Sequence, residues 1–415
     1  MKPIKILLLT VAISTGWFIT VAATFAQTWT QTSLPGEYWQ TVASSADGSK
    51  LIAGSSLGSG IYGISTNSGT TWITNTEPQI GSYNGSWHCI ASSADGTRYA
   101  GVNGNAIWVS TNSGLTWLSN SVPGASFFGF VALSADGSKM VAGAGAYGSS
   151  PSGIYTSTNS GVTWAQTTAP TNGWASIASS ADGTKLVTVA QNSTGGLIYA
   201  STDSGLTWAL TGAPTNNSWA TVASSADGSK LVAASGLAFV PNLFYGCVYT
   251  STNFGMTWTS NNVPAAQWQS VASSADGTKL VAVAVEPFGL IYSSTNSGAT
   301  WISNAVPDES WLSVASSADG DKLVLVAMVD QSYNPGHVYT SQTTPSPVLN
   351  IKPASNNNLA LSWIVPSTNF VMQQSSDLSD WTEMTNSPVL NLTNLQDEVI
   401  LSPPGSNIFY RLKTP

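Results

Sequence analysis

The acidic side chains are the most regularly spaced candidates for chemistry in this sequence. One aspartate recurs in the same A-D-G turn at intervals of 41–49 residues, at Asp47, Asp95, Asp136, Asp182, Asp227, Asp276 and Asp319. Catalysis by paired carboxylates, as in glycoside hydrolysis, needs two acids that flank one bond. A residue repeated seven times at even spacing is more typical of a structural turn, so a catalytic pair must come from the other acids.

The other acids of residues 27–344 are scattered over different repeats. They are Asp203, which belongs to a second repeated motif, and Glu37, Glu77, Glu286, Asp308, Glu309, Asp321 and Asp330. Two of them, for example Glu77 and Glu286, could meet across a central opening and cleave a glycan, whereas solvated loop acids are the alternative interpretation. Asp321 follows an A-D-G turn, and we expect it to be exposed.

Histidine and cysteine are too sparse to build a familiar site. His88 and His337 are the only histidines, and Cys89 and Cys247 the only cysteines. Each pair lies in distant repeats, which gives no zinc signature, no Ser-His-Asp set and no expected disulfide. The many glycines occupy fixed turn positions rather than a phosphate-binding loop. We therefore assign no catalytic residues, no metal and no cofactor.

Aromatic residues are the candidates for ligand binding. Each repeat opens with one of them, at Trp39, Trp87, Phe128, Trp174, Trp219, Trp268 and Trp311. If the following strand lines a channel, this ring lies at its mouth and could stack on sugars at several points. Packing between neighbouring repeats is the alternative. Phe239, Phe244 and Tyr245 lie in the longest variable stretch and are further candidates, because binding residues concentrate in loops on a constant scaffold.

The elements that must position these residues follow from the repeat, which reads W-x-x-V-A-S-S-A-D-G-[ST]-K-L-V-A and then [IV]-Y-x-S-T-N-S-G-x-T-W. In the first copy we expect strands at 39–44, 50–53, 61–66 and 70–72, with Asp47-Gly48 and Asn67-Ser68-Gly69 as tight turns. Four short strands every 40–50 residues predict an all-β, seven-bladed β-propeller. The seventh copy lacks its fourth strand, and residues 27–32 read as that strand, which would close the ring.

The motif S-T-N-S-G-x-T-W resembles the Asp-box, or bacterial neuraminidase repeat, S-x-D-x-G-x-T-W. Six copies begin at Ser65, Ser110, Ser157, Ser201, Ser251 and Ser294, and only Asp203 keeps the motif aspartate. The resemblance covers residues 27–344 and implies a sialidase-like propeller with the box as a peripheral turn. Sialidases hold a carboxylate with three arginines. The repeats contain only Arg98, so sialidase activity is disfavoured.

Residues 345–415 break the repeat and contain alternating runs at 359–365, 370–374, 381–384, 399–402 and 408–412. These runs predict a small β-sandwich of fibronectin type III or immunoglobulin kind. At the other end, residues 1–26 have the pattern of a signal peptide, with cleavage after Ala26 or Ala23 and an uncleaved membrane anchor as the alternative.

Composition narrows the class of function. Charged residues make up only 8% of the 415 residues, the formal net charge is −8, and the sequence pI is about 4.6. An acidic protein is not expected to bind nucleic acid. We therefore expect a secreted, periplasmic or cell-surface binding module for glycans or an extracellular protein, which contacts a membrane only if the N-terminal segment stays uncleaved. A glycoside hydrolase-like enzyme and a structural cell-envelope protein remain the alternatives.

Overall fold

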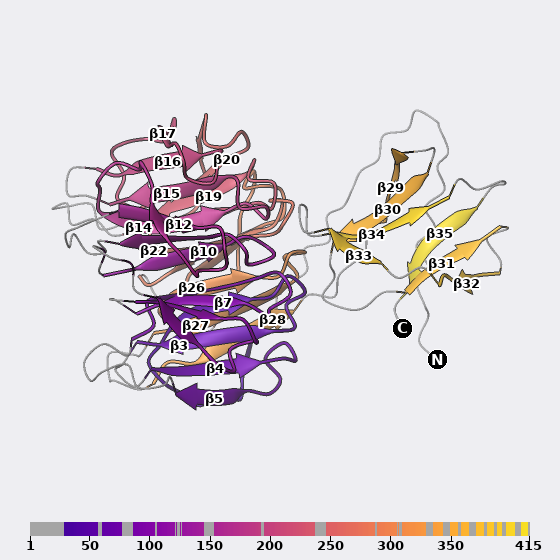
Figure 1. The fold of residues 1–415 in the computed structure, drawn as a ribbon, viewed down its shortest axis with the longest axis horizontal. Coiled ribbons are helices and arrows are strands. Elements are labelled where there is room, and N and C mark those ends of the chain that lie inside the picture. The colour runs from indigo at the N-terminus through magenta and orange to yellow at the C-terminus, as the bar shows by residue number, and fades with distance from the viewer. Residues whose placement is uncertain are drawn as a thin grey trace.

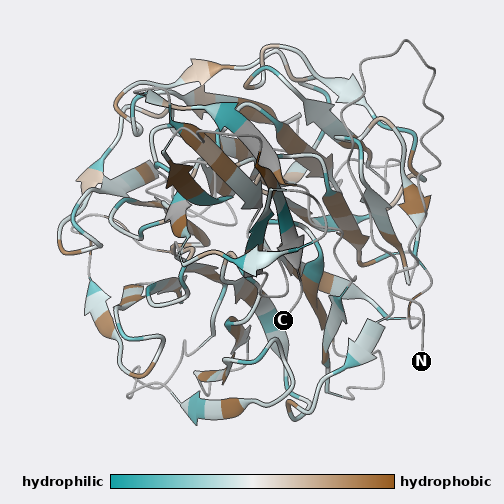
Figure 2. Cartoon of the chain, turned by 90° about the vertical axis from the view of Figure 1, so that its right-hand side faces the viewer, coloured by the Kyte–Doolittle hydropathy of each residue, from teal (hydrophilic) through white to brown (hydrophobic). Residues whose placement is uncertain are grey.

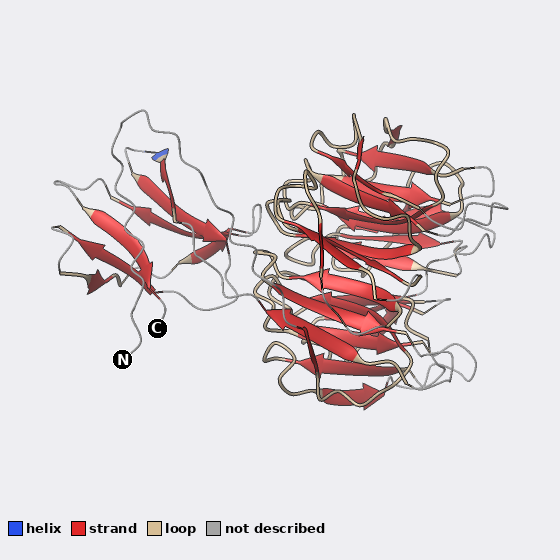
Figure 3. Cartoon of the chain, turned by 180° about the vertical axis from the view of Figure 1, so that it is seen from behind, coloured by secondary structure: helices blue, strands red, loops and turns tan. Residues whose placement is uncertain are grey.

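A computed structural model of the chain consists almost entirely of strands joined by loops and turns (Figure 3). It describes residues 29–413 except 57–59, 77–85, 104–105, 121, 123–124, 126, 145–152, 192–194, 237–245, 287–288, 305, 307–308, 329–334, 343–348, 356–357, 365–370, 377–379, 386–387, 392–395 and 403–407. No helix of the described part has the length and apolar character that crossing a membrane requires.

The repeats form seven antiparallel sheets of four strands, which we call blades one to seven, with strands A to D in order from the inside outwards. Blade one contains β2 (Trp39–Ser44), β3 (Leu51–Ser55), β4 (Ile61–Ser65) and β5 (Ile73–Thr76); blade two β6 (Cys89–Ser92), β7 (Tyr99–Val102), β8 (Ile107–Ser110) and β9 (Leu118–Asn120); blade three β10 (Phe130–Leu133), β11 (Met140–Ala144), β12 (Gly153–Ser157) and β13 (Ala165–Gln166). Blade four contains β14 (Trp174–Ser179), β15 (Leu186–Ala190), β16 (Leu197–Ser201) and β17 (Ala209–Leu210); blade five β18 (Trp219–Ser224), β19 (Leu231–Ser235), β20 (Val248–Ser251) and β21 (Thr259–Ser260); blade six β22 (Trp268–Ser273), β23 (Leu280–Ala284), β24 (Ile291–Ser294) and β25 (Ile302–Ser303).

Blade seven joins the two ends of the repeat region. It contains β26 (Trp311–Ser316), β27 (Lys322–Ala327), β28 (Val338–Gln342) and, from the N-terminal side, β1 (Trp29–Gln31). β1 pairs antiparallel with β28, with Trp29 opposite Ser341 and Gln31 opposite Tyr339. This pairing confirms the prediction that an N-terminal strand supplies the missing fourth strand.

The blades close into a ring, and the sheets are arranged around a centre in Figure 2. The alanine of each A-D-G turn donates its backbone N–H to the carbonyl of the equivalent alanine in the next blade, at 2.7–2.8 Å. The chain of seven bonds returns to its start, since Ala318 N donates to Ala46 O. These small residues form a buried cluster because strand A of every blade converges on the axis.

Strand D differs from the expectation. We expected it to start at Thr70, whereas β5 starts at Ile73 and residues 66–72 form a turn. The Asn67 side chain accepts the backbone N–H of Thr71 at 2.9 Å, and the Trp72 indole donates to Gly69 O at 3.1 Å. These local bonds keep residues 66–72 out of the sheet, so strand D begins directly after the tryptophan. Strand D begins at the same point in the other copies of the motif.

The C-terminal residues form two further antiparallel sheets. One contains β29 (Asn350–Pro353), β30 (Leu359–Ile364), β34 (Gln396–Leu401) and β33 (Val389–Asn391), and the other β32 (Thr382–Glu383), β31 (Val371–Ser375) and β35 (Phe409–Lys413). Leu361, Trp363, Met372, Val399 and Leu401 form a shared buried core. The sequence patterns located five of these strands and missed β29 and β33, which carry no clear alternation. In Figure 1, β33 and β34 lie at the end of this unit nearest the propeller.

Candidate functional site

The ring of aromatic residues that opens each strand A is buried, and the expectation of an exposed sugar-stacking ring is wrong. Trp39, Trp87, Phe128, Trp174, Trp219, Trp268 and Trp311 are all 0–2% exposed. Each side chain packs between its own blade and the preceding one; Trp268, for instance, shares a buried cluster with Val232 and Val248 of blade five and with Val271 of blade six. The alternative interpretation, packing between repeats, is therefore the correct one. The gap between diverging sheets needs large rings to fill it.

These rings also pack against the tyrosines of strand C. Trp174, Trp219, Trp268 and Trp311 each meet a tyrosine edge-on, with ring centroids 5.2–5.9 Å apart. The indole N–H groups of Trp39 and Trp87 donate to Pro35 O and Gly60 O. The indole N–H groups of Trp174, Trp219, Trp268 and Trp311 are buried without a partner. None of these groups can reach a ligand without opening the interface between blades.

The A-D-G aspartates are bonded within their own turns. Asp227 accepts the Ser225 hydroxyl at 2.6 Å and both the backbone N–H and the hydroxyl of Ser229 at 2.9 Å. Burial raises the pKa of Asp227, but these hydrogen bonds and the charge of Lys185 outweigh burial and leave the pKa below its usual value. Asp47, Asp95, Asp136, Asp182 and Asp276 have lowered pKa values of similar origin. Each of these carboxylates accepts hydrogen bonds within its own turn, which agrees with the structural interpretation of the repeated aspartate.

The cation that follows each of these turns connects neighbouring blades, a role that sequence reasoning missed. Lys50, Lys185, Lys230 and Lys322 donate to the turn carbonyls of Asp95, Asp227, Asp276 and Asp47 in the next blade, at 2.7–3.1 Å. Lys139 and Arg98 donate to Ser204 and Ser160 hydroxyls, and Lys279 pairs with Asp321 at 2.7 Å. The signal was present in the repeat, because a cation at a fixed position in every copy implies a shared structural partner.

The S-T-N-S-G-x-T-W segments form the second set of turns. Ser201 accepts the backbone N–H of Gly205 and donates to Asp203, whose carboxylate accepts the backbone N–H and hydroxyl of Thr207. Hydrogen bonds from Thr207 and then Ser201 lower the pKa of Asp203 to about 2. Asn67, Asn112, Asn159, Asn253 and Asn296 accept the equivalent backbone N–H in the other copies. Asparagine therefore maintains the turn where aspartate is replaced.

The two kinds of turn lie together on one side of the propeller, which we call the turn face. In blade one, Ser68 N donates to Ser49 O at 2.8 Å and joins the two turns, and the other complete blades repeat this bond. The B–C loops and D–A connections lie at the opposite strand ends, on what we call the loop face. Six residues that the sequence analysis considered lie outside the described residues: Phe239, Phe244, Tyr245, Glu77, Asp308 and Asp330.

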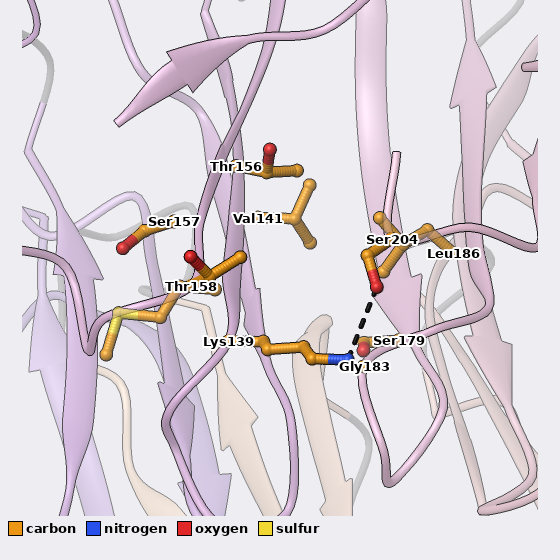
Figure 4. A pocket seen from close by; sticks show the side chains of 10 residues that line it. Lys139, Val141, Thr156, Ser157, Thr158, Ser179, Gly183, Leu186 and Ser204 are labelled. Carbon is orange, nitrogen blue, oxygen red and sulfur yellow. Dashed lines mark hydrogen bonds between the residues drawn. The ribbon is translucent and has the colours of Figure 1, made fainter. Parts of the chain in front are cut away.

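Neither the cavity on the axis nor the cavity between blades three and four suits a large ligand. One, on the axis, has a volume of about 160 Å³ and is lined mainly by Ser44, Ser92, Ser179, Ser224, Ser273, Ser316 and the ring alanines. This is below the 300 Å³ typical of small-molecule pockets. The other lies between blades three and four, where Lys139 Nζ approaches Ser204 Oγ (Figure 4). Its volume of about 10 Å³ holds roughly one water.

The described acids of the loop face gather at blades six, seven and one. Glu286 is exposed in the B–C loop of blade six, and Gly289 of the same loop donates its N–H to Glu309 O at 2.9 Å. The Glu309 carboxylate accepts the Tyr339 hydroxyl at 2.9 Å. Burial, and then the hydrogen bond and charge of Glu309, raise the Tyr339 pKa. The Glu37 N–H donates to Gly336 O, next to His337. The backbone bond from Gly289 to Glu309 thus joins the B–C loop of blade six to the connection that precedes blade seven.

Comparison with known proteins identifies the class by fold. No family model and no curated protein matches this sequence. Solved structures that resemble it include the GH74 xyloglucanase of Xanthomonas campestris (14% identity, TM-score 0.57, 81% of this chain and 59% of that one) and the GH74 enzyme of Niastella koreensis (14%, 0.58, 94% and 74%). YCF48 bound to D1 peptide is also similar (12%, 0.54, 78% and 98%). The chain is therefore an all-β protein of the β-propeller fold and spans about three-fifths of the Xanthomonas enzyme.

Proposed function

We propose that this chain is a non-catalytic, secreted or surface-displayed binding module whose partner docks on the loop face. One observation carries the proposal: the two faces use their charges differently. All seven lysine and arginine side chains of residues 27–344 are bonded on the turn face. Glu37, Glu286 and Glu309 lie on the loop face, so none of these seven cations is left to accompany them there. A face that can offer only negative charge and neutral groups repels anionic ligands. The partner is accordingly a protein segment with basic residues.

The finer architecture is part of this proposal. The seven described blades, with β1 closing the last, support a seven-bladed propeller of the Asp-box kind, and the two C-terminal sheets with one shared core support a small β-sandwich. Residues 1–26 act as the export signal. Phe239, Phe244 and Tyr245 remain the proposed loop contacts of the partner. YCF48, with its bound D1 peptide, illustrates that a propeller of this size can hold a peptide.

Binding of charged probes tests the proposal. Residues 27–415 are immobilised and exposed to an octalysine peptide, an octaglutamate peptide and a neutral xyloglucan oligosaccharide. We expect octalysine to bind, with affinity that falls as salt rises, and octaglutamate not to bind. Glu286→Gln should weaken octalysine binding several-fold. Asp203→Asn removes the same charge on the turn face and should leave binding unchanged, because five other copies already carry asparagine there. Equal losses in both variants would contradict a loop-face site.

A glycoside hydrolase-like enzyme is the second candidate, favoured by the backbone bond that joins the loop of Glu286, through Gly289, to Glu309. The hydrolase pattern requires carboxyl groups roughly 5–10 Å apart across an open site. Release of reducing ends from xyloglucan, abolished by Glu286→Gln and by Glu309→Gln alike, would establish it. If neither probe binding nor hydrolysis occurs in folded protein, the structural cell-envelope role takes their place.

A further inference from the structure

The C-terminal sheets carry the one arginine of the sequence that lies outside the propeller repeats, Arg411 in β35. Its Nε and Nη2 groups donate to Oε1 of Gln373 in β31, at 2.9 and 2.7 Å. Gln373 pairs with Arg411 across the two strands and is only 5% exposed. A buried neutral amide therefore orients this guanidinium without cancelling its positive charge.

A tryptophan holds the same guanidinium by stacking. The guanidinium carbon of Arg411 lies 4.1 Å from the centre of the Trp381 ring. Trp381 directly precedes β32, and β31 lies between β32 and β35 in this sheet, so the two side chains meet over the central strand. The ring contact and the two hydrogen bonds fix the plane of the guanidinium before any ligand arrives.

These side chains lie on the outer face of the sheet. Met372 belongs to the core that the two C-terminal sheets share, and Tyr410 packs against that core. Successive side chains of a strand point to opposite faces, so Gln373 and Arg411 point away from the core. Phe409 lies on the same outer face as Arg411 and is 38% exposed. In Figure 1, β31, β32 and β35 lie farther from the propeller than β33 and β34.

The charge of Arg411 has no carboxylate partner among the residues that the structure describes, where the one ion pair joins Lys279 to Asp321. Glu383 pairs with Gln373 from the other side, so β31 separates it from Arg411. Gln373 occupies the edge of the guanidinium that Nε and Nη2 form. The remaining edge, formed by Nη1 and Nη2, presents two parallel N–H groups, which match a carboxylate in bidentate geometry.

We propose that this outer face is a second binding site, which takes a carboxylated sugar such as a hexuronate unit of an acidic polysaccharide. The sugar carboxylate accepts the two free N–H groups of Arg411, and the apolar side of the sugar ring lies against Phe409. The two residues are neighbours on one face of β35, about 7 Å apart at the usual rise of a strand. An acidic peptide offers carboxylates without a flat ring, and a neutral glycan offers the ring without the charge, whereas a uronate uses both.

Calorimetric titration of residues 27–415 with octagalacturonate and with its methyl ester tests the site. The two ligands share their sugar rings, and only the first is charged. We expect octagalacturonate to bind, with affinity that falls as salt rises, and the ester to bind at least tenfold more weakly. Octaglutamate, which has the carboxylates without the rings, should not bind.

Four substitutions separate the contributions to this site. Arg411→Gln removes the cation and should weaken binding at least tenfold. Gln373→Glu gives Arg411 an internal carboxylate, so it should weaken binding similarly although the arginine is retained. Phe409→Ala removes the stacking surface and should weaken binding several-fold. Arg98→Gln removes the same charge from the propeller and is the matched control, which should bind as the wild type does.

Several results would overturn the proposal: no binding of octagalacturonate by folded protein, equal affinity for the ester, or unchanged binding by Arg411→Gln. Octaglutamate binding as tight as that of octagalacturonate would assign an acidic protein segment in place of the sugar. Thermal unfolding of each variant shows whether the C-terminal sheets are intact. Octalysine binding, which we assign to the loop face, should be the same in Arg411→Gln and the wild type, so failure of one site is distinguishable from failure of the other.

Discussion

The turn face and the loop face of this propeller are made from the same repeats, yet charged groups are hydrogen-bonded on the turn face and exposed on the loop face. On the turn face, Asp227 is hydrogen-bonded inside its own turn and Lys185 is bonded to the next blade. On the loop face, Glu286 is exposed and no cation is available to pair with it. The residues that recur in every repeat are therefore structural, and function is to be sought where the repeats differ.

Removing a ring aromatic should have the largest effect. Trp219 is 0% exposed and shares a buried cluster with Val187, Val189 and Ile198 of blade four. Trp219→Ala should lower the free energy of unfolding by about 3–5 kcal/mol, as large-to-small changes of buried aromatics do. Chemical denaturation measures the loss. Leu206→Ala, at a side chain that is 72% exposed, is the control and should change stability by less than about 0.5 kcal/mol. A stable Trp219→Ala protein that loses ligand binding would restore the ring as a binding site.

Breaking one A-D-G turn should have an intermediate effect. Asp227→Ala leaves the Ser229 N–H and two hydroxyls without their acceptor, so we expect a loss of about 1–2 kcal/mol. Equilibrium unfolding in urea measures it. Octalysine binding should be unaffected, and reduced binding in a folded variant would show that the turn face takes part in recognition.

Acid should weaken the turn face as a whole. The pKa values of Asp47, Asp95, Asp136, Asp182, Asp227 and Asp276 are lowered in the folded state, so their stabilisation is present above the ordinary value of about 3.9 and is lost as pH falls through the lowered values. Melting temperature should hardly change between pH 7 and pH 5 and should fall below pH 4. A fall that begins near pH 6 would point to histidine instead.

A single lysine between blades should contribute less. Lys230 donates to Asp276 O at 2.9 Å and to Ser297 Oγ at 3.2 Å, and its methylenes cover Gly277. Lys230→Met keeps the apolar cover and removes the charge, so a loss of about 0.5–1 kcal/mol is expected. Lys230→Ala removes both and should cost more. Equal losses in urea unfolding would mean that only the hydrogen bonds of the ammonium group matter and that the methylene packing contributes nothing.

The smallest effect on stability belongs to the loop face. Glu286 is exposed and its only described side-chain bond, from Gln267, is long at 3.4 Å. Glu286→Gln should change the unfolding free energy by less than about 0.5 kcal/mol. The same variant should weaken octalysine binding several-fold, so the ratio of binding loss to stability loss is the sharpest measure of the difference between the faces.

The strands and turns of each blade could be predicted from the sequence. The Asp-Gly turns, the S-T-N-S-G-x-T-W turns and the alternation of short apolar runs are local signals, since each depends on residues within a few positions of one another. The missing fourth strand of blade seven and the N-terminal candidate for it could also be recognised from the repeat alone. The late start of strand D was not recognised, because the Asn67 bond to Thr71 delays it and strand patterns do not record that bond.

Which side chains are available for function depends on contacts between blades. The sequence could not tell whether Trp219 faces a ligand or a neighbouring blade, because burial depends on how sheets far apart in the chain pack together. For the same reason it could not bring Glu309 to Tyr339 and to the loop of Glu286, nor show that Asp321, which we expected to be exposed, is buried. Hydrogen-bonded turns are encoded locally, whereas exposure and the charge balance of a face arise from contacts between repeats.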